Sequence, residues 1–239
     1  GTVTAKDAGS VGISISGDNA SFTNTGTITA SNEATGVSIS GNNSSTTLDG
    51  DVSLAIEQDA AGTVHGETGV AISGNQNSVD ITGDVTISTP TPLGLVSGET
   101  DADITGVSVT GTGNTLTLDG SLTLDEQRTV DDDRGTVEVT GLDVEGDNNT
   151  VYLKGGVNID ATNDAMSQWH YFDNSKTGIK ISGESEVIVS DNSSLSLSPA
   201  TDNATSAPST AVFAKVSDGG ALLFDDTSVL DISMDVGNT

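Results

Sequence analysis

The sequence predicts an all-β protein: a right-handed parallel β-helix with three-stranded coils, about seven rungs and loop insertions from one vertex. Three observations predict this fold. A ten-residue phrase recurs along the 239-residue chain, short runs alternate apolar and polar residues, and Gly, Asn and Asp separate these runs. No stretch has the periodicity of a long amphipathic helix. We therefore expect one β-helical domain over residues 1–239.

The repeated phrase begins with Thr-Gly and continues with alternating apolar residues. Its five copies read TGVSISGNNS from Thr35, TGVAISGNQN from Thr68, TGVSVTGTGN from Thr105, TGLDVEGDNN from Thr140 and TGIKISGESE from Thr177. A related copy comes earlier, and a degenerate one, AVFAKVSDGG, starts at Ala211. The glycines that anchor the copies are Gly12, Gly36, Gly69, Gly106, Gly141 and Gly178. Variable spacing around a fixed phrase indicates a stacked repeat with loop insertions.

Each copy contains three short strand-like runs. In the copy that starts at Thr68 these runs are GVAISG, SVDITG and DVTIST. Because the side chains of a strand point alternately to its two faces, the apolar residues of each run share one face. Gly, Asn and Asp tolerate the left-handed backbone that tight corners need. The corners are too short for a helical crossover, so the three strands must form a coil.

Alignment of the copies predicts inward columns of aliphatic residues. Neighbouring rungs lie about 4.8 Å apart, so equivalents above and below bury each inward side chain and about seven rungs make a rod of roughly 30–35 Å. The columns are Ile13, Val37, Val70, Val107, Leu142 and Ile179; Ile15, Ile39, Ile72, Val109, Val144 and Ile181; Leu48, Ile81, Leu118 and Leu153; and Val52, Val85, Leu122 and Val157.

Two polar columns are also predicted. The outward residues Asp143 and Lys180 should be rung neighbours and form a surface ion pair worth under ~1 kcal/mol. A corner ladder, in which Asn side chains bond to local backbone, should precede the second strand of each coil. Its members are Asn19, Asn43, Asn77, Asn114 and Asn149.

The variation in length falls after the third strand of each copy. The insertions are residues 57–67, 89–103, 125–139, 160–176 and 198–209. They should leave the coil at one vertex, lie above one another and form a continuous ridge. Solenoids commonly place their binding surface where insertions collect.

Two groups of residues in this ridge are candidates for ligand binding, and each has a structural alternative. Exposed aromatic residues are favoured anchors at interfaces and for sugar stacking, but they also pack locally beneath long loops. An acidic run offers oxygen ligands to a hard cation, but it is also typical of a solvated loop, here with Arg128 and Arg134 beside it. The candidates are Trp169, His170, Tyr171 and Phe172, and Asp131, Asp132 and Asp133.

Composition restricts the function classes. The formal net charge is −28, from 35 acidic and 7 basic residues, which disfavours nucleic acid and anionic membranes as partners. The chain has no cysteine, and its only histidines, His65 and His170, lack the partners of a zinc site. We expect no cofactor, no metal and no catalytic residues.

The grammar TGVxISGNN…LTLDGxVxL resembles the passenger domains of AIDA-type (type Va) autotransporter adhesins of Gram-negative bacteria. The resemblance extends from VGISISGDN to LLFDDTSVLDIS. It implies a protein that reaches the bacterial cell surface through the periplasm and an outer-membrane β-barrel at its own C-terminus. Residues 1–239 are then expected to be a fragment of the passenger, without the signal peptide or the translocator barrel.

Three functions follow from this resemblance and from the predicted fold. The leading expectation is a non-enzymatic adhesin that binds a host extracellular-matrix protein or glycan through a loop-lined face of the β-helix. The alternative is homotypic self-association, which mediates aggregation or biofilm formation. The third is a polysaccharide-degrading enzyme, for which Lys176 and Lys180 are the nearest approach to a basic pair and no carboxylate pair stands out.

Overall fold

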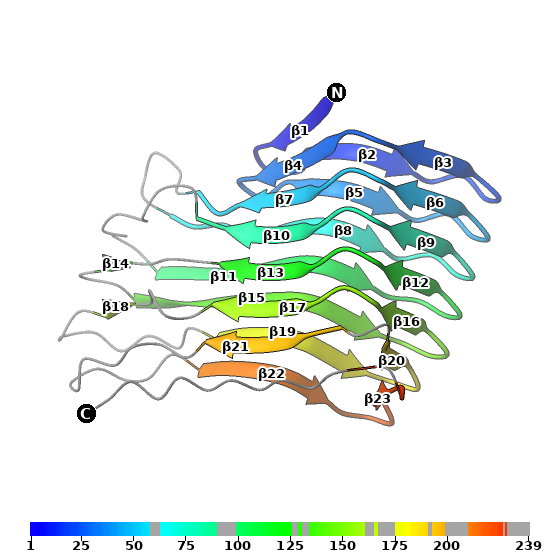
Figure 1. Ribbon diagram of the computed structural model, residues 1–239. Helices are drawn as coiled ribbons and strands as arrows, with labels where there is room; N and C mark the ends of the chain where they lie inside the picture. Colours follow the sequence, from blue (N-terminus) through cyan, green and yellow to red (C-terminus); the bar gives the residue numbers. More distant parts are fainter. Residues whose placement is uncertain are drawn as a thin grey trace.

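The computed structural model describes residues 1–57, 63–89, 99–125, 129–130, 134–160, 165–166, 175–190, 193–198, 210–226 and 228. In these ranges the chain is all β-strand, turn and bend. The strands wind into coils that stack on one another from the N-terminal end, at the top of Figure 1, to the C-terminal end.

Three parallel sheets, each of seven strands, run along the stack. Sheet A consists of β1 (Thr2–Lys6), β4 (Thr27–Ser31), β7 (Val52–Ala55), β10 (Val85–Ser88), β13 (Leu122–Asp125), β17 (Val157–Asp160) and β21 (Leu195–Ser198). Sheet B consists of β2 (Val11–Ile15), β5 (Thr35–Ile39), β8 (Glu67–Ile72), β11 (Glu99–Val109), β15 (Arg134–Glu145), β19 (Ser175–Ser182) and β22 (Thr210–Val216). Sheet C consists of β3 (Ser21–Asn24), β6 (Ser45–Leu48), β9 (Ser78–Ile81), β12 (Thr115–Leu118), β16 (Thr150–Leu153), β20 (Glu186–Val189) and β23 (Ala221–Phe224).

The predicted all-β parallel β-helix with three strands per coil is therefore confirmed. The predicted number of rungs needs a correction. Complete coils of three described strands are β2–β4, β5–β7, β8–β10, β11–β13, β15–β17 and β19–β21, which makes six. Only β1 precedes them and only β22 and β23 follow them among the described strands.

The predicted inward columns are confirmed by the strand register. Val37 pairs with Val70 and Val107 with Leu142 in sheet B, Leu48 with Ile81 in sheet C, and Val85 with Leu122 in sheet A. Almost all of these side chains are fully buried; Ile13, in the first coil, is only partly buried. Each coil thus buries the aliphatic residues of its neighbours, which is how a repeat protein is stabilised.

Close approach of successive backbones explains the glycine of the repeated phrase. A Cβ placed on Gly69 would lie 2.5 Å from the carbonyl oxygen of Gly106, and one on Gly106 would lie 2.6 Å from that of Gly141. No side chain fits at such distances. The column of repeat glycines ends after Gly178, because the next coil has Phe213 at this position.

The predicted asparagine ladder exists, but two of its members were wrong. Asn77, Asn114 and Asn149 are buried, and the Oδ1 atom of each accepts a hydrogen bond from a backbone N–H of the preceding coil, the donors being Ser44, Asn77 and Asn114 at 2.9 Å. Their Nδ2 atoms donate to Gly41, Gly74 and Gly111 carbonyls.

Asn19 and Asn43 lie one position before this ladder. Both adopt a left-handed backbone with a φ of 56°. The ladder position of the second coil belongs to Ser44, whose Oγ donates to the Gly17 carbonyl at 3.0 Å. The prediction failed because an Asn at either of two adjacent corner positions is favourable, in one for its backbone and in the other for its side chain.

Every insertion connects the end of a sheet A strand to the start of the next sheet B strand, as predicted. The described parts of the insertions also pair with one another. Residues 99–104 of β11 pair in register with residues 134–139 of β15. In a separate two-stranded sheet, β14 (Thr129–Val130) pairs with β18 (Ala165–Met166), at the left of Figure 1. We call these four segments the flange.

Candidate functional site

The ligand-binding residues predicted from the sequence belong to two of the three insertions that contribute to the flange, 125–139 and 160–176. Trp169, His170, Tyr171 and Phe172, and Asp131, Asp132 and Asp133, lie outside the described residues. The strands that lead into them are described: β14 ends at residue 130, β18 ends at residue 166, and residues 130 and 166 are paired partners. The aromatic and the acidic segment therefore each follow a strand of the same two-stranded sheet. The sequence did not predict this pairing.

Lys176 closes the base of the longest insertion, residues 160–176. Its side chain is only 4% exposed, and its Nζ donates a hydrogen bond to the carbonyl oxygen of Asp160 at 3.0 Å. Asp160 and Lys176 are the first and last residues of this insertion, so the contact ties its two ends together. Lys176 pairs with Val139, which pairs with Ile104, which pairs with Glu67, so all four occupy one column at the start of sheet B.

Glu67 places a carboxylate inside the same column. It is 2% exposed, and neither of its carboxylate oxygens makes a hydrogen bond within the described residues, although the backbone of Asn32 faces it. The pKa of Glu67 is raised to about 8. Burial is the largest cause, the backbone of Asn32 opposes it, and the negative charge of Glu57 adds to it. At neutral pH the side chain is therefore mostly protonated and uncharged.

Two polar contacts lie at the base of the first insertion, residues 57–67. Lys6 Nζ lies 3.2 Å from Glu57 Oε2, and His65 Nδ1 lies 2.7 Å from Glu33 Oε1. These contacts attach one end of the insertion to β1 and the other end to the turn that follows β4.

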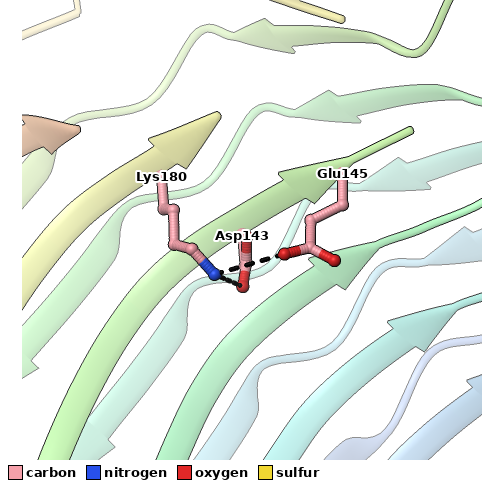
Figure 2. A network of polar contacts seen from close by, with 3 residues as sticks. All are labelled: Asp143, Glu145 and Lys180. Carbon is pink, nitrogen blue, oxygen red and sulfur yellow. Dashed lines mark hydrogen bonds and ion pairs between the residues drawn. The ribbon is translucent and has the colours of Figure 1, made fainter. Parts of the chain in front are cut away.

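The outer face of sheet B carries a second polar cluster (Figure 2). Lys180 Nζ on β19 lies 2.9 Å from Asp143 Oδ2 and 3.3 Å from Glu145 Oε1, both on β15. The hydrogen bond that Lys180 donates to Asp143 is the main cause of the raised pKa of Lys180. The predicted rung contact between Asp143 and Lys180 is confirmed.

Lys176 and Lys180 do not form a basic pair. Lys176 is buried at the base of an insertion, whereas the Lys180 side chain is 41% exposed on the outer face of sheet B. The alternation of inward and outward residues shifts by one near the Thr-Gly step of sheet B strands, since Ile104 and Val107, three residues apart, are both buried. For this reason two lysines four residues apart can lie on opposite faces. The pair of cations that the enzymatic alternative would need is therefore separated by the sheet.

A groove at the vertex between sheets B and C was not predicted. It has a volume of about 540 Å³, and its lining includes Asn148, Thr150, Glu184, Glu186 and Gly219. One sequence signal could have indicated it. The corner that reads Gly-Asp-Asn-Asn-Thr at 146–150 becomes Gly-Glu-Ser-Glu at 183–186, which is one residue shorter and has the carboxylate of Glu186 in register with Thr150.

In the described ranges, no group of three or more His, Cys, Asp or Glu side chains is placed to hold a metal ion. The same ranges contain no helix long and apolar enough to span a membrane. Comparisons of the chain with protein-family models, curated proteins and solved structures found no match.

Proposed function

We propose that the protein is a non-enzymatic adhesin, a rod that presents its insertions as one surface to a host extracellular-matrix protein or glycan. The observation that carries the proposal is the in-register pairing of the insertion bases in the flange. Pairing aligns insertions from successive coils, so residues about 35 positions apart in sequence can contact one ligand together. A rigid scaffold with adjacent variable loops is a common way to build a binding surface.

The resemblance to AIDA-type passenger domains supports a location on the bacterial surface, with an outer-membrane β-barrel elsewhere in the full protein. The lack of cysteine and the strongly acidic composition agree with this proposal. An unfolded chain without disulfides passes more readily through a pore, and a net charge of −28 keeps an elongated surface soluble. Nucleic acid remains an unsuitable partner for the same charge.

The test replaces residues 167–172 by a Gly/Ser segment of equal length, which leaves the paired strand β18 intact. Binding to arrays of glycans and matrix proteins should be lost, while the far-ultraviolet circular dichroism and the melting temperature stay unchanged. The control replaces residues 202–207, in an insertion without Trp, Tyr or Phe, in the same way. Full binding by the first variant would refute the aromatic segment as the contact site.

Self-association is the second candidate, and one observation favours it. The first outward column of sheet A contains no charged residue, although the protein carries a charge of −28. Its members, paired in register, are Thr4, Thr29, Ser53, Thr86, Thr123, Asn158 and Ser196. Two rods could meet through this neutral column with less repulsion than elsewhere. Sedimentation at several salt and calcium concentrations tests this candidate, and a strictly monomeric rod would exclude it.

A further inference from the structure

The outward face of sheet C changes character along the stack. In the upper coils its central column contains Thr47, Asp80 and Thr117, which pair in register. In the lower coils the same column continues through residues that we call the apolar stripe: Tyr152, Ile188 and Leu223. Tyr152 is 38% exposed and Leu223 is 44% exposed. Because rungs are about 4.8 Å apart, three such side chains in line cover roughly 10 Å of surface.

The positions of Tyr152 and Ile188 on the rod distinguish them from the other exposed apolar residues. Val11, Val216 and Phe224 belong to the first or last described coil, which lacks a neighbouring rung on one side, and Leu223 shares β23 with Phe224. Tyr152 and Ile188 have a described strand on each side and still face outward, and Leu223 continues their column. Single exposed apolar residues are ordinary, whereas several aligned on one face mark an interaction surface.

The stripe borders the groove at the B–C vertex. Thr150, Glu186 and Ala221 line the groove, and they pair with one another across β16, β20 and β23. Each stands two residues before a member of the stripe, so it lies on the same face of its strand, about 7 Å away. Groove and stripe therefore form one continuous outer surface.

The groove is negatively charged. Glu184 and Glu186 contribute carboxylates to it, and its lining contains no Lys or Arg. Thr150 Oγ1 donates to Glu186 Oε1 at 3.2 Å, so Glu186 has one neutral partner. Lys180, on the neighbouring sheet B, is already engaged by Asp143 and Glu145. A ligand that fills the groove must therefore bring positive charge to balance it.

We propose that this surface binds an extended, basic protein segment, with a Lys or Arg in the groove and a neighbouring aliphatic or aromatic side chain on the apolar stripe. Alternate side chains of an extended segment are spaced about 7 Å apart, which matches the offset between groove and stripe. Tyr152 adds an aromatic face that favours a cation or an apolar group.

Other occupants fit less well. A second copy of the chain would bring its own charge of −28 and the same acidic groove, so the two would repel. A neutral glycan could stack on Tyr152, but it would leave Glu184 and Glu186 without a counter-charge. The surface also lies at the B–C vertex, whereas the insertions leave at the A–B vertex. The proposal is therefore independent of the adhesin function and of the insertions that serve it.

The test uses the full chain and three labelled ten-residue peptides that alternate Leu with Lys, Gln or Glu. Fluorescence anisotropy should show binding of the Lys peptide, at least about tenfold weaker binding of the Gln peptide and no binding of the Glu peptide, as expected for an interface that depends on charge complementarity. Binding of the Lys peptide should weaken as salt rises. A neutral glycan such as dextran serves as the competitor and should not displace the peptide.

Two double variants separate the contributions of groove and stripe. Glu184→Gln with Glu186→Gln should weaken binding of the Lys peptide about tenfold. Tyr152→Ser with Leu223→Thr should weaken it by a similar factor, and this loss should persist at high salt because it removes apolar contact. The matched control is Asp7→Asn with Asp18→Asn, which makes the same change in net charge on exposed residues of the first coils and should alter binding less than about twofold.

Four outcomes would overturn the proposal. One is equal weakening by the control and by the groove variant, which would mean nonspecific attraction to an acidic rod. The second is equal binding of the Lys and Gln peptides, and the third is displacement of the Lys peptide by dextran. The fourth is no binding of the Lys peptide to the unmodified chain. None of these outcomes bears on the replacement of residues 167–172, so the two proposals fail or stand separately.

Discussion

At the scale of single residues, two ionisable side chains occupy buried positions that are aliphatic in neighbouring coils. Glu67 stands in a column whose next members are Ile104 and Val139. A carboxyl group without hydrogen bonds in such a place is costly, and it avoids part of that cost by retaining its proton. Lys176 meets the same environment but keeps a hydrogen bond to Asp160.

Glu67→Gln should stabilise the protein at neutral and alkaline pH and have little effect at pH 4. The folded-state pKa of about 8 lies above the unfolded value of 4.5. Folding therefore takes up a proton between these values, and stability falls as pH rises from 4.5 towards 8, by an upper limit on the order of 5 kcal/mol. Urea unfolding from pH 4 to 9 measures the change. Equal slopes against pH for the variant and the original protein would contradict the assignment.

Gly106→Ala should destabilise the stack by roughly 2–3 kcal/mol, because the added Cβ would lie 2.6 Å from the carbonyl oxygen of Gly141 and force two coils apart. Gly17→Ala is the control, since a Cβ there meets no atom within 4 Å. Thermal unfolding of both variants gives the comparison. A similar melting temperature for the two would show that the coils separate easily at this step.

At the scale of structural elements, the corners between sheets B and C are stabilised from inside. The asparagine ladder provides each turn with hydrogen bonds to the coils on both sides, so the turns cannot shift independently of one another. Outside it runs a second ladder, in which Asp18 accepts from Asn42, Asn42 from Asn75 and Asn75 from Thr112, at 2.9–3.0 Å for the backbone donors. Solvent competes for the outer bonds and not for the inner ones.

Asn114→Ala should cost about 2–4 kcal/mol, since it leaves the Asn77 N–H and the Gly74 carbonyl buried without their partner. Asn42→Ala, which removes a half-buried member of the outer ladder, should cost at most about 1 kcal/mol. Chemical denaturation of the pair measures the difference. Equal losses would mean that the inner ladder contributes no more than the solvated one.

At the scale of the whole molecule, stacking by nearest neighbours acts against strong charge repulsion. The aliphatic columns of sheets A and B are continuous through all six complete coils, whereas the net charge of −28 is distributed over the chain. Repulsion of this kind destabilises a compact state and is screened by salt.

Raising NaCl from 10 to 300 mM should therefore raise the melting temperature by several degrees, as should choline chloride at the same ionic strength, because both screen the charge equally. Scanning calorimetry measures the effect. A rise produced only by micromolar calcium would instead indicate a specific cation site, for which the Asp131–Asp133 run is the sequence candidate.

Much of the fold could be predicted because its signals are local and repeated. Alternation at every second position identifies the inward face of each strand, and five copies of one phrase align the columns without knowledge of any contact. Ser44 and Asn43 show the limit: two adjacent polar residues satisfy the corner pattern, and only the coils above and below determine which one points inward.

The candidate sites depended more on tertiary structure. The aromatic and acidic segments stood out by composition alone, and the pairing of β14 with β18 is what relates them. Tyr152 gave no signal in sequence, because an outward strand position accepts nearly any residue.

The sequence alone thus determined the three-stranded coil, the aliphatic columns and the vertex from which the insertions leave, since each follows from a short pattern that every copy repeats. The tertiary structure decided the burial of Glu67 and Lys176, the flange, and the acidic groove beside Tyr152, Ile188 and Leu223. The physical reason is the distance along the sequence between the residues involved. These features arise between residues about 35 positions apart, which meet only when one coil stacks on the next.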